Sequence, residues 1–316
     1  MAPMPRPIII DTDVGQDDAV AILLALASPA ELEVLGIVAV AGNVPLALTQ
    51  RNARMVCELA GRREVPVYAG CERPLHRDLV TAEYIHGKTG LDGPTLPEPT
   101  MKLQPQHGVD FLIDTLRRAE PGAVTLCTLG PLTNIGMALV KAPDIVPKVR
   151  ELVMMGGAYF EVGNTTPAAE FNIYVDPHAA DVVLRSGIPI TIIPLDVSHK
   201  ALTTALRIQR FRALGTRCGR AVAEMLEFFE RHDVEKYGAD GGPLHDPGVI
   251  AYLLRPALYR GRRVNVAIET GSPLTLGMSV VDWWRVTDRP PNAQFMNDVD
   301  ADGFYDLLTE RIATLP

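Results

Sequence analysis

The sequence predicts an α/β protein with one open, mostly parallel sheet, doubly wound with helices on both faces. Continuous runs of Val, Ile and Leu recur along the first two thirds of the chain, and helix-like segments separate them. Uninterrupted apolar strands are typical of parallel sheets that are covered on both faces. Neither a linker nor an internal repeat interrupts the 316 residues, so we expect one domain over 1–316, with ligands at the carboxyl ends of the strands.

The elements of the first two thirds follow this alternation in order. The apolar runs predict strands over residues 7–13, 34–41, 65–69, 123–129, 151–155 and 189–195. The segments between them predict helices over residues 17–28, 46–59, 109–119, 134–141 and 177–185. Two loops, 70–106 and 156–176, exceed the usual connection between a strand and a helix, and such loops tend to carry function.

The pattern changes after Asp196. We expect a long helix over 205–231, a glycine-rich loop over 238–242, a helix after Asp246, strands over 264–269 and 275–281, and a last helix over 303–313. Trp283 and Trp284 are expected to pack in a late strand.

Composition excludes several classes of function. Thirty basic and 38 acidic side chains leave a net charge of −8, which opposes a phosphate backbone, so we expect no nucleic-acid partner. The apolar run over 19–30 is shorter than the ~20 residues that span a bilayer, so we expect no membrane partner. Four cysteines without a C-x-x-C spacing predict neither a disulfide framework nor a zinc site, and they indicate a reducing cytoplasm.

Four carboxylates, Asp11, Asp13, Asp17 and Asp18, fall within eight residues at the end of the first predicted strand. Gly15 permits a tight turn there, and acids in a first helical turn cap the helix, which accounts for the second pair alone. Two carboxylates about 4 Å apart repel by about 4 kcal/mol at an effective dielectric of 20, whereas one helix end returns at most ~2 kcal/mol. The cluster therefore needs raised pKa values or a cation, and hard oxygen ligands without nearby His or Cys suit calcium or magnesium.

The segment from Asp11 to Asp13 also resembles the aspartate-nucleophile phosphatases, whose first strand ends in the same D-x-D pattern. Those enzymes have Thr or Val two residues after the second Asp, where this chain has Gly15. No later motif supplies the lysine that balances charge near their phosphate. A phosphatase is kept as an alternative.

Further polar segments stand at predicted strand ends or in the long loops. They are Gly42-Asn43, the turn over 129–134, the loop over 163–172 with Asn164, Glu170, Phe171 and Asn172, the glycine-flanked His86, and Leu244-His245-Asp246-Pro247. Amide and carboxylate groups can pair with adjacent sugar hydroxyls, which favours hydroxyl recognition by the 163–172 loop. Asp246 could instead cap a helix that begins with Pro247. The other histidines (His76, His107, His178, His199 and His232) are expected at the surface or behind the site.

Taken together, these motifs resemble the inosine-uridine type nucleoside hydrolases. The shared motifs are Asp11-Thr12-Asp13-x-Gly15-x-Asp17-Asp18-Ala19, Gly42-Asn43, Gly130-Pro131-Leu132-Thr133-Asn134, Met155-Gly156-Gly157, Glu170-Phe171-Asn172 and His245-Asp246-Pro247. They occur in the family's order and cover the chain from about residue 8 to about residue 281. The resemblance implies a calcium-dependent enzyme, a homotetramer or homodimer, that cleaves the N-glycosidic bond of ribonucleosides to ribose and a free base.

The resemblance also implies roles for individual residues. Asp13, Asp18, Asp246 and the Leu129 main-chain carbonyl would bind Ca²⁺, and Asp13 would take a proton from a calcium-bound water. Asp17, Asn43, Asn164, Glu170 and Asn172 would hold the ribose hydroxyls, with Phe171 in the same substrate site. His245 would help the base to leave, and His86 would line the base pocket as a further catalytic group. Tyr237 is a candidate base contact, with core packing as its alternative.

Two departures from the family and one alternative function bear on this interpretation. Val14 stands where many relatives have Pro, and Leu129 stands where Thr is often found, which a main-chain ligand tolerates. The His before Asp246 points to the inosine-uridine or pyrimidine-preferring groups, but purine or pyrimidine preference stays open. A calcium-dependent nucleoside- or sugar-binding protein without turnover is the alternative, and the presence of Asp13 and His245 favours catalysis.

Overall fold

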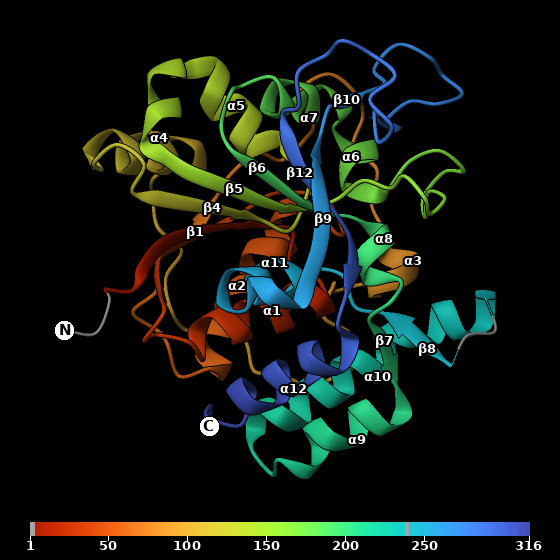
Figure 1. Cartoon of the computed structure of the whole chain (residues 1–316). Coiled ribbons are helices and arrows are strands. Elements are labelled where there is room, and N and C mark those ends of the chain that lie inside the picture. Colours follow the sequence, from red (N-terminus) through yellow and green to blue (C-terminus); the bar gives the residue numbers. More distant parts are fainter. Residues whose placement is uncertain (1–3, 238–239) are drawn as a thin grey trace.

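An eight-stranded sheet forms the centre of the computed structural model, which describes residues 4–237 and 240–316 (Figure 1). In spatial order its strands are β3 (Val67–Ala69), β2 (Leu32–Ala39), β1 (Arg6–Thr12), β4 (Val124–Thr128), β5 (Val149–Met155), β6 (Ile190–Ile193), β12 (Ala293–Val299) and β9 (Tyr259–Val264). The first seven run parallel, and β9 pairs antiparallel with β12 at the edge. The predicted α/β class with a mostly parallel sheet is confirmed.

Helices cover both faces of this sheet, as predicted. One face carries α1 (Gln16–Leu26), α2 (Leu46–Leu59), α10 (Arg217–Tyr237), α11 (Pro247–Leu254) and α12 (Ala301–Ile312), with α9 (Ala205–Ala213) packed on α10. The other carries α4 (Gly108–Arg118), α5 (Thr133–Lys141), α7 (Pro177–Leu184) and the 3-10 helix η1 (Pro143–Lys148). Strand β1 serves both layers, because Ile8 and Ile10 join the first core and Ile9 joins the second.

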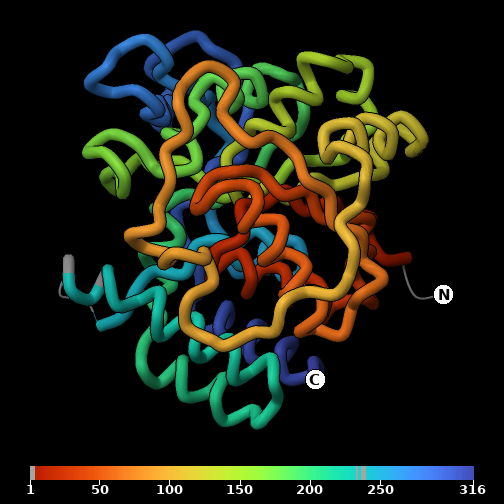
Figure 2. The backbone as a smooth tube through the Cα atoms, turned by 180° about the vertical axis from the view of Figure 1, so that it is seen from behind, coloured from red at the N-terminus to blue at the C-terminus, as the bar shows by residue number. Residues whose placement is uncertain are grey.

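Short elements complete the chain. They are α3 (Glu83–His86), α6 (Phe171–Val175), α8 (Leu195–Ser198), the 3-10 helix η2 (Pro256–Leu258), the pair β7 (Leu202–Thr204) and β8 (Gly241–Pro243), and the pair β10 (Val266–Ile268) and β11 (Ser279–Val281). The two long loops carry α3 and α6, and the first of them wraps across the side of the molecule that Figure 2 presents. Among the described residues, no helix combines the length and apolar character that a membrane span needs.

The structure corrects the prediction of one helix over 205–231. The chain forms α9 and α10 instead, and Gly215 between them has φ +72°. A residue in this left-handed region cannot continue a right-handed helix, so the glycine breaks the run. The glycine-rich loop predicted over 238–242 lies partly outside the described residues, and its end forms β8.

The last third also differs from the prediction. Strands β9 and β12 of the main sheet were not expected, and the predicted strands over 264–269 and 275–281 shrink to β10 and β11. Four of the six residues of β9 are exposed and three of these are arginines, so its sequence lacks the apolar run of a buried strand. Trp283 is buried but lies outside a strand, and Trp284 is 70% exposed, so the packing predicted for Trp284 is wrong.

Candidate active site

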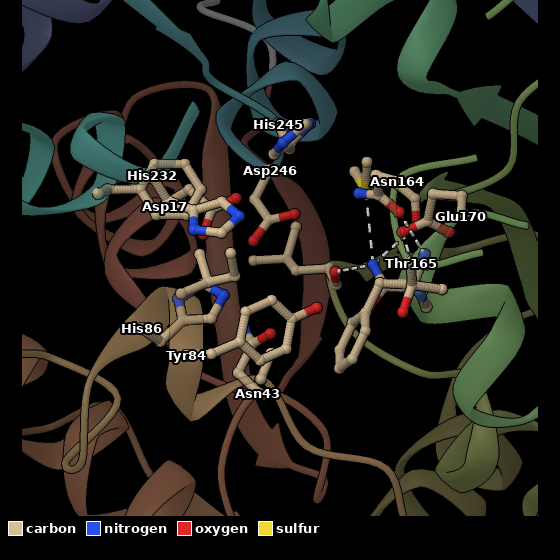
Figure 3. Close-up of a pocket in the computed structure, with 17 residues that line it drawn as sticks. Asp17, Asn43, Tyr84, His86, Asn164, Thr165, Glu170, His232, His245 and Asp246 are labelled. Atoms are coloured by element: carbon tan, nitrogen blue, oxygen red, sulfur yellow. Dashed lines mark hydrogen bonds between the residues drawn. The ribbon is translucent and has the colours of Figure 1, made fainter. Parts of the chain in front are cut away.

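A pocket that is partly open to solvent lies at the carboxyl ends of β1, β4 and β5, between the two long loops and α10 (Figure 3). Its lining residues are Asp17, Asn43, Ala82, Tyr84, Ile85, His86, Leu129, Met155, Asn164, Thr165, Glu170, Phe171, Asn172, Phe229, His232, His245 and Asp246. The parallel strands direct their ends, and the loops that follow them, to this one edge of the sheet. Nine of the predicted substrate, catalytic and metal-binding side chains therefore meet in one pocket. Leu129, whose main-chain carbonyl is the predicted ligand, lines it as well.

Buried carboxylates form one end of the pocket. Asp17 and Asp18, in the first turn of α1, place a carboxylate oxygen each within 4.8 Å of an oxygen of Asp246. Asp246 precedes Pro247 at the start of α11, but its side chain makes no capping hydrogen bond. The capping alternative for Asp246 therefore has no support in the geometry, and its carboxylate is available to a ligand.

Asp13 lies just beyond β1 and is enclosed by main chain. The Asn43 N–H donates to its Oδ2 at 2.7 Å, while its Oδ1 is buried and has no hydrogen-bond partner among the described residues. A Cβ placed on Gly42 would stand 2.1 Å from Oδ2, and one placed on Gly130 would stand 2.4 Å from Oδ1. The glycines of the Gly42-Asn43 and Gly130-Pro131 motifs thus make room for this carboxylate.

Asp18 is held by three donors. The Thr12 hydroxyl donates to Oδ1, and the Gly15 N–H and the Asn43 side-chain amide donate to Oδ2 at 2.9 and 3.1 Å. Asn43 therefore orients both Asp13 and Asp18, in addition to lining the pocket. The sequence placed Asn43 at a strand end but did not predict this contact with the two carboxylates.

The electrostatics of the cluster favour a bound cation. Burial, and then the charges of neighbouring carboxylates, raise the pKa values of Asp13 and Asp246 well above their usual range. Burial and the Asp18 charge raise the pKa of Asp17 to about 8. No Lys or Arg in the described part of the chain forms an ion pair with these groups. Unpartnered carboxylate oxygens on Asp13 and Asp17 are the hard donors that Ca²⁺ or Mg²⁺ prefers.

Asp11 does not join this cluster. Strand alternation places it on the same face as Asp13 in the sequence, yet its Oδ2 accepts from the Asn134 amide of α5 at 2.8 Å. Asp13 and Asp18, like Asp11, lie behind the residues that line the pocket, but in the described contacts only Asp11 is bonded to α5. Burial raises the pKa of Asp11 to about 7. The first acid of the motif thus joins β1 to α5, behind the site.

The second long loop forms the opposite wall, where Figure 3 shows Asn164 and Glu170 across from His86 and His232. Both Glu170 oxygens accept main-chain N–H groups, from Gly157 and from the first turn of α6. Asn164 accepts from the Phe171 N–H, which leaves its amide nitrogen without a partner in the described contacts. Burial raises the pKa of Glu170 to about 7.

Histidines and aromatic rings form the remaining wall. The Phe229 ring of α10 lies near two imidazoles, with ring centroids 5.4 Å from His86 and 6.2 Å from His245. His245 Nδ1 hydrogen-bonds to the Ser198 hydroxyl at 2.8 Å. Burial lowers the pKa values of both histidines to about 3, so both are neutral at pH 7 in the free protein. Neutral imidazoles beside an apolar ring suit a heterocyclic ligand.

Comparison with known proteins decides the family. The model of a family described as inosine-uridine preferring nucleoside hydrolase matches residues 8–306. An uncharacterised protein of Schizosaccharomyces pombe is 57% identical over 309 residues, which are 98% of this chain and 99% of that protein. The pyrimidine-specific ribonucleoside hydrolase RihA of Escherichia fergusonii is 49% identical over 311 residues, 98% and 99% of the two chains. The chain belongs to the inosine-uridine preferring nucleoside hydrolase family.

Solved structures agree with this nucleoside hydrolase assignment. A purine-preferring ribonucleoside hydrolase from Gardnerella vaginalis superposes with a TM-score of 0.91 at 34% identity, and the match covers 98% of each chain. The resemblance stated from the motifs is confirmed, as is the prediction of an enzyme that hydrolyses N-glycosidic bonds of ribonucleosides. The aspartate-nucleophile phosphatase is thereby set aside.

Some residues of this nucleoside hydrolase pocket were missed by sequence reasoning. Tyr84, Phe229 and His232 line it, although His232 was expected at the surface or behind the site. Phe229 belongs to an amphipathic helix, where an apolar residue is ordinarily read as core, and no local pattern marks the turn of that helix that faces a cavity. The side chain of Tyr237, the candidate base contact, lies outside the described residues.

Proposed function

We propose that this nucleoside hydrolase cleaves pyrimidine ribonucleosides to ribose and a free base, with Ca²⁺ held by Asp13, Asp18, Asp246 and the Leu129 carbonyl. One observation carries the proposal. A single pocket has buried carboxylates at one end, amide and carboxylate groups on one wall, and neutral histidines on the other. This arrangement matches the three parts of a nucleoside hydrolysis: water activation, ribose binding and base departure.

The donor set supports calcium rather than a softer metal. Every candidate ligand is a carboxylate or carbonyl oxygen, and the Oδ1 atom of Asp13 is buried without a partner among the described residues. Asp17, whose Oδ1 is likewise unpartnered, lies close enough to Asp18 and Asp246 to face the same ion or a ribose hydroxyl. Bound Ca²⁺ supplies a positive charge that acidifies and orients a water molecule beside the sugar.

Asp13 is proposed to accept the proton of the attacking water. Its Oδ1 is the unpartnered atom, whereas its Oδ2 is held by the Asn43 N–H, so the carboxylate is oriented before substrate binds. A fixed base avoids the cost of reorganising during the reaction. Gly42 and Gly130 lie against this carboxylate, and neither carries a side chain that would displace it.

The ribose is proposed to lie between Asp17 and the 163–172 loop. Asn164 offers an unused amide nitrogen, and Glu170, Phe171 and Asn172 line the same wall. Cleavage of the glycosidic bond builds positive charge on the sugar, and carboxylate and carbonyl oxygens around it stabilise that charge. Glu170 is held by three main-chain N–H groups, so its carboxyl group is fixed in position.

The base is proposed to occupy the wall of histidines. His245 would protonate the departing base, a contribution of about 10²- to 10⁴-fold for general acid catalysis. Because burial lowers its pKa, His245 is neutral in the free protein, so the proton that it gives to the base would first have to be taken up from solvent, as negative charge develops on the base. His86 and Phe229 would contact the ring of the base.

The preference for pyrimidines rests on relatives. Several curated relatives at 46–49% identity over 98% of the chain carry the name pyrimidine-specific ribonucleoside hydrolase. The Gardnerella enzyme named purine-preferring is less similar, at 34% identity. A homotetramer or homodimer in the cytoplasm is also proposed, on the resemblance and on the cysteine pattern alone.

Release of reducing sugar from a panel of nucleosides tests the proposal. The panel comprises uridine, cytidine, inosine, adenosine, 2′-deoxyuridine and uridine monophosphate, each with excess Ca²⁺ and with a chelator. We expect ribose from uridine and cytidine with Ca²⁺ and a loss of activity on chelation that added Ca²⁺ reverses. Uridine binding without ribose release would support the binding protein instead, and faster release from inosine would overturn the pyrimidine preference.

A further inference from the structure

Gln16 is a buried amide that belongs to no predicted role, and it contacts the base wall of the pocket. It is 0% exposed and stands at the start of α1, between the turn at Gly15 and Asp17. Its Nε2 donates to two main-chain carbonyls, those of His86 at 3.0 Å and Asp92 at 2.9 Å. Its Oε1 lies 2.8 Å from Nδ1 of the His86 ring.

These contacts determine which way the Gln16 amide faces. A carbonyl oxygen only accepts hydrogen bonds, so the two carbonyls of His86 and Asp92 require the NH₂ group of the amide. Turning the amide over would place Oε1 against two oxygens and leave both without a donor. Oε1 therefore faces the imidazole, and the group opposite it must carry a hydrogen.

The orientation of the amide in turn determines the tautomer of His86. Nδ1 must donate to Oε1, so Nδ1 carries the hydrogen whether the ring is neutral or charged, and in the neutral ring Nε2 has a free lone pair. The ring lies directly on the turn, since a Cβ on Gly15 would stand 2.3 Å from Nδ1. Nε2 has no hydrogen-bond partner among the described residues, and His86 lines the pocket.

We propose that Gln16 is a positioning residue that holds His86 as its Nδ1–H tautomer, with the Nε2 lone pair directed at the nucleobase. This inference rests on the proposed function for the identity of the ligand. It implies that His86 approaches the base as a hydrogen-bond acceptor for a polar N–H of the heterocycle. Any proton that His86 exchanges during turnover must pass through Nε2, because the hydrogen on Nδ1 is donated to Gln16.

A second buried amide separates this role from simple anchoring of the loop. Asn52 is 0% exposed and donates to the carbonyls of Val14 and Thr89, at 3.1 and 2.8 Å. Like Gln16, Asn52 therefore connects the first long loop to the turn that precedes α1. Unlike Gln16, it makes no hydrogen bond to the His86 ring. Asn52→Leu is therefore a control for loss of loop anchoring alone.

Nitrogen NMR of the ¹⁵N-histidine-labelled, calcium-loaded enzyme tests the tautomer directly. The His86 signals are assigned by their loss in His86→Gln, since the chain has seven histidines. We expect a protonated, pyrrole-type shift at Nδ1 and a pyridine-type shift at Nε2. A protonated Nε2 with a pyridine-type Nδ1 would overturn the inference. The spectrum is independent of turnover, so an enzyme that shows the expected tautomer but releases no ribose would contradict only the proposed function.

Matched variants test the dependence on Gln16. Gln16→Met keeps the length of the side chain and removes its three hydrogen bonds, so we expect population of the Nε2–H tautomer and a fall in kcat of about 10- to 100-fold. Asn52→Leu should keep the wild-type His86 shifts even if its melting temperature falls. Wild-type shifts in a folded Gln16→Met would overturn the proposal, as would equal changes in both variants. If Gln16→Met does not fold, the wild-type spectrum decides the assignment.

Discussion

The side-chain amide of Asn172 donates a hydrogen bond of 2.7 Å to the main-chain carbonyl of Leu129. Leu129 follows β4, and Asn172 lies in α6, so this contact joins a strand end to the second long loop. The same carbonyl is a proposed calcium ligand, and the same loop is the proposed ribose wall. One hydrogen bond thus connects the proposed calcium site to the loop that is proposed to bind ribose.

Asn172→Asp should weaken both functions of this contact. An ionised carboxylate cannot donate to the Leu129 carbonyl, and it repels that oxygen. We expect the affinity for Ca²⁺ to fall about tenfold, as is typical when a residue that orients a metal ligand is lost, together with a higher KM. Calorimetric Ca²⁺ titration and uridine kinetics measure the two effects. The same substitution at the partly exposed Asn297 should change neither, and unchanged Ca²⁺ binding by Asn172→Asp would argue against the carbonyl ligand.

Gly42→Ala should disturb the proposed metal site without replacing a ligand. The added methyl group would stand 2.1 Å from Oδ2 of Asp13, so the carboxylate or the turn has to move. We expect at least about tenfold weaker Ca²⁺ binding, together with a lower kcat. Gly271→Ala is the control, because its Cβ would meet only Glu269 Oε1 at 3.5 Å. Equal Ca²⁺ affinity in the two variants would remove Asp13 from the proposed metal site.

Asp13→Asn should lose most turnover and bind Ca²⁺ more weakly. The amide cannot accept the proton of water, so we expect kcat to fall about 10²- to 10⁴-fold. Asp11→Asn is the matched control, because it changes a buried Asp of the same motif that accepts from Asn134 of α5 instead of from the Asn43 N–H. Steady-state kinetics at saturating Ca²⁺ separate the two variants. Turnover at the wild-type rate by Asp13→Asn would exclude Asp13 as the base.

His245→Ala should slow natural nucleosides much more than a substrate with an activated leaving group. A nitrophenyl riboside leaves without protonation, so the loss of an acid at the base matters little for it. We expect a fall in kcat of about 10²-fold or more on uridine and a small change on the activated riboside. His199→Ala tests the specificity of the effect, since that ring lies 6.2 Å away and does not line the pocket. Equal losses on both substrates would argue against acid assistance.

Chelation should make thermal stability depend on pH in a defined direction. Burial raises the pKa of Asp17 to about 8, above the ~3.9 of an unfolded chain, so the folded apoprotein binds more protons than the unfolded chain. This contribution to stability is complete below the unfolded pKa and disappears as the pH rises through about 8. We expect a higher melting temperature at about pH 6 than at pH 8 in chelator, and greater stabilisation by Ca²⁺ at pH 8. Equal stabilisation by Ca²⁺ at both pH values would contradict the proposal.

The first six strands could be predicted because each is a short, continuous apolar run. Those runs are long enough to identify a strand, and their burial between two helix layers accounts for their composition. The edge of the sheet could not be predicted, because half of β9 is exposed arginine and β12 mixes polar with apolar residues. Their pairing depends on long-range contacts that leave no local period in the sequence.

The candidate site, like the sheet, contains residues that could be predicted from the sequence and residues that could not. Asp13, Asp17 and Asp18 could be found from sequence because they crowd into a few residues, and their mutual repulsion demands an explanation. The contribution of Phe229 to the pocket could not be predicted from the sequence, because the pattern of an amphipathic helix does not show whether an apolar residue faces the core or a cavity. His232 likewise carries no sequence signal that separates a pocket residue from a surface one.

Residue types at short spacings were therefore sufficient to predict the α/β class, the acidic cluster and the family resemblance. Which atoms of those residues already form hydrogen bonds became known only from the folded chain. Gln16 meets the His86 ring across 70 positions, and Asn172 meets Leu129 across 43, so neither contact follows from local pattern. Hydrogen bonding is short-ranged and directional, and its partners are set only when the parallel strands bring their carboxyl ends to one edge of the sheet.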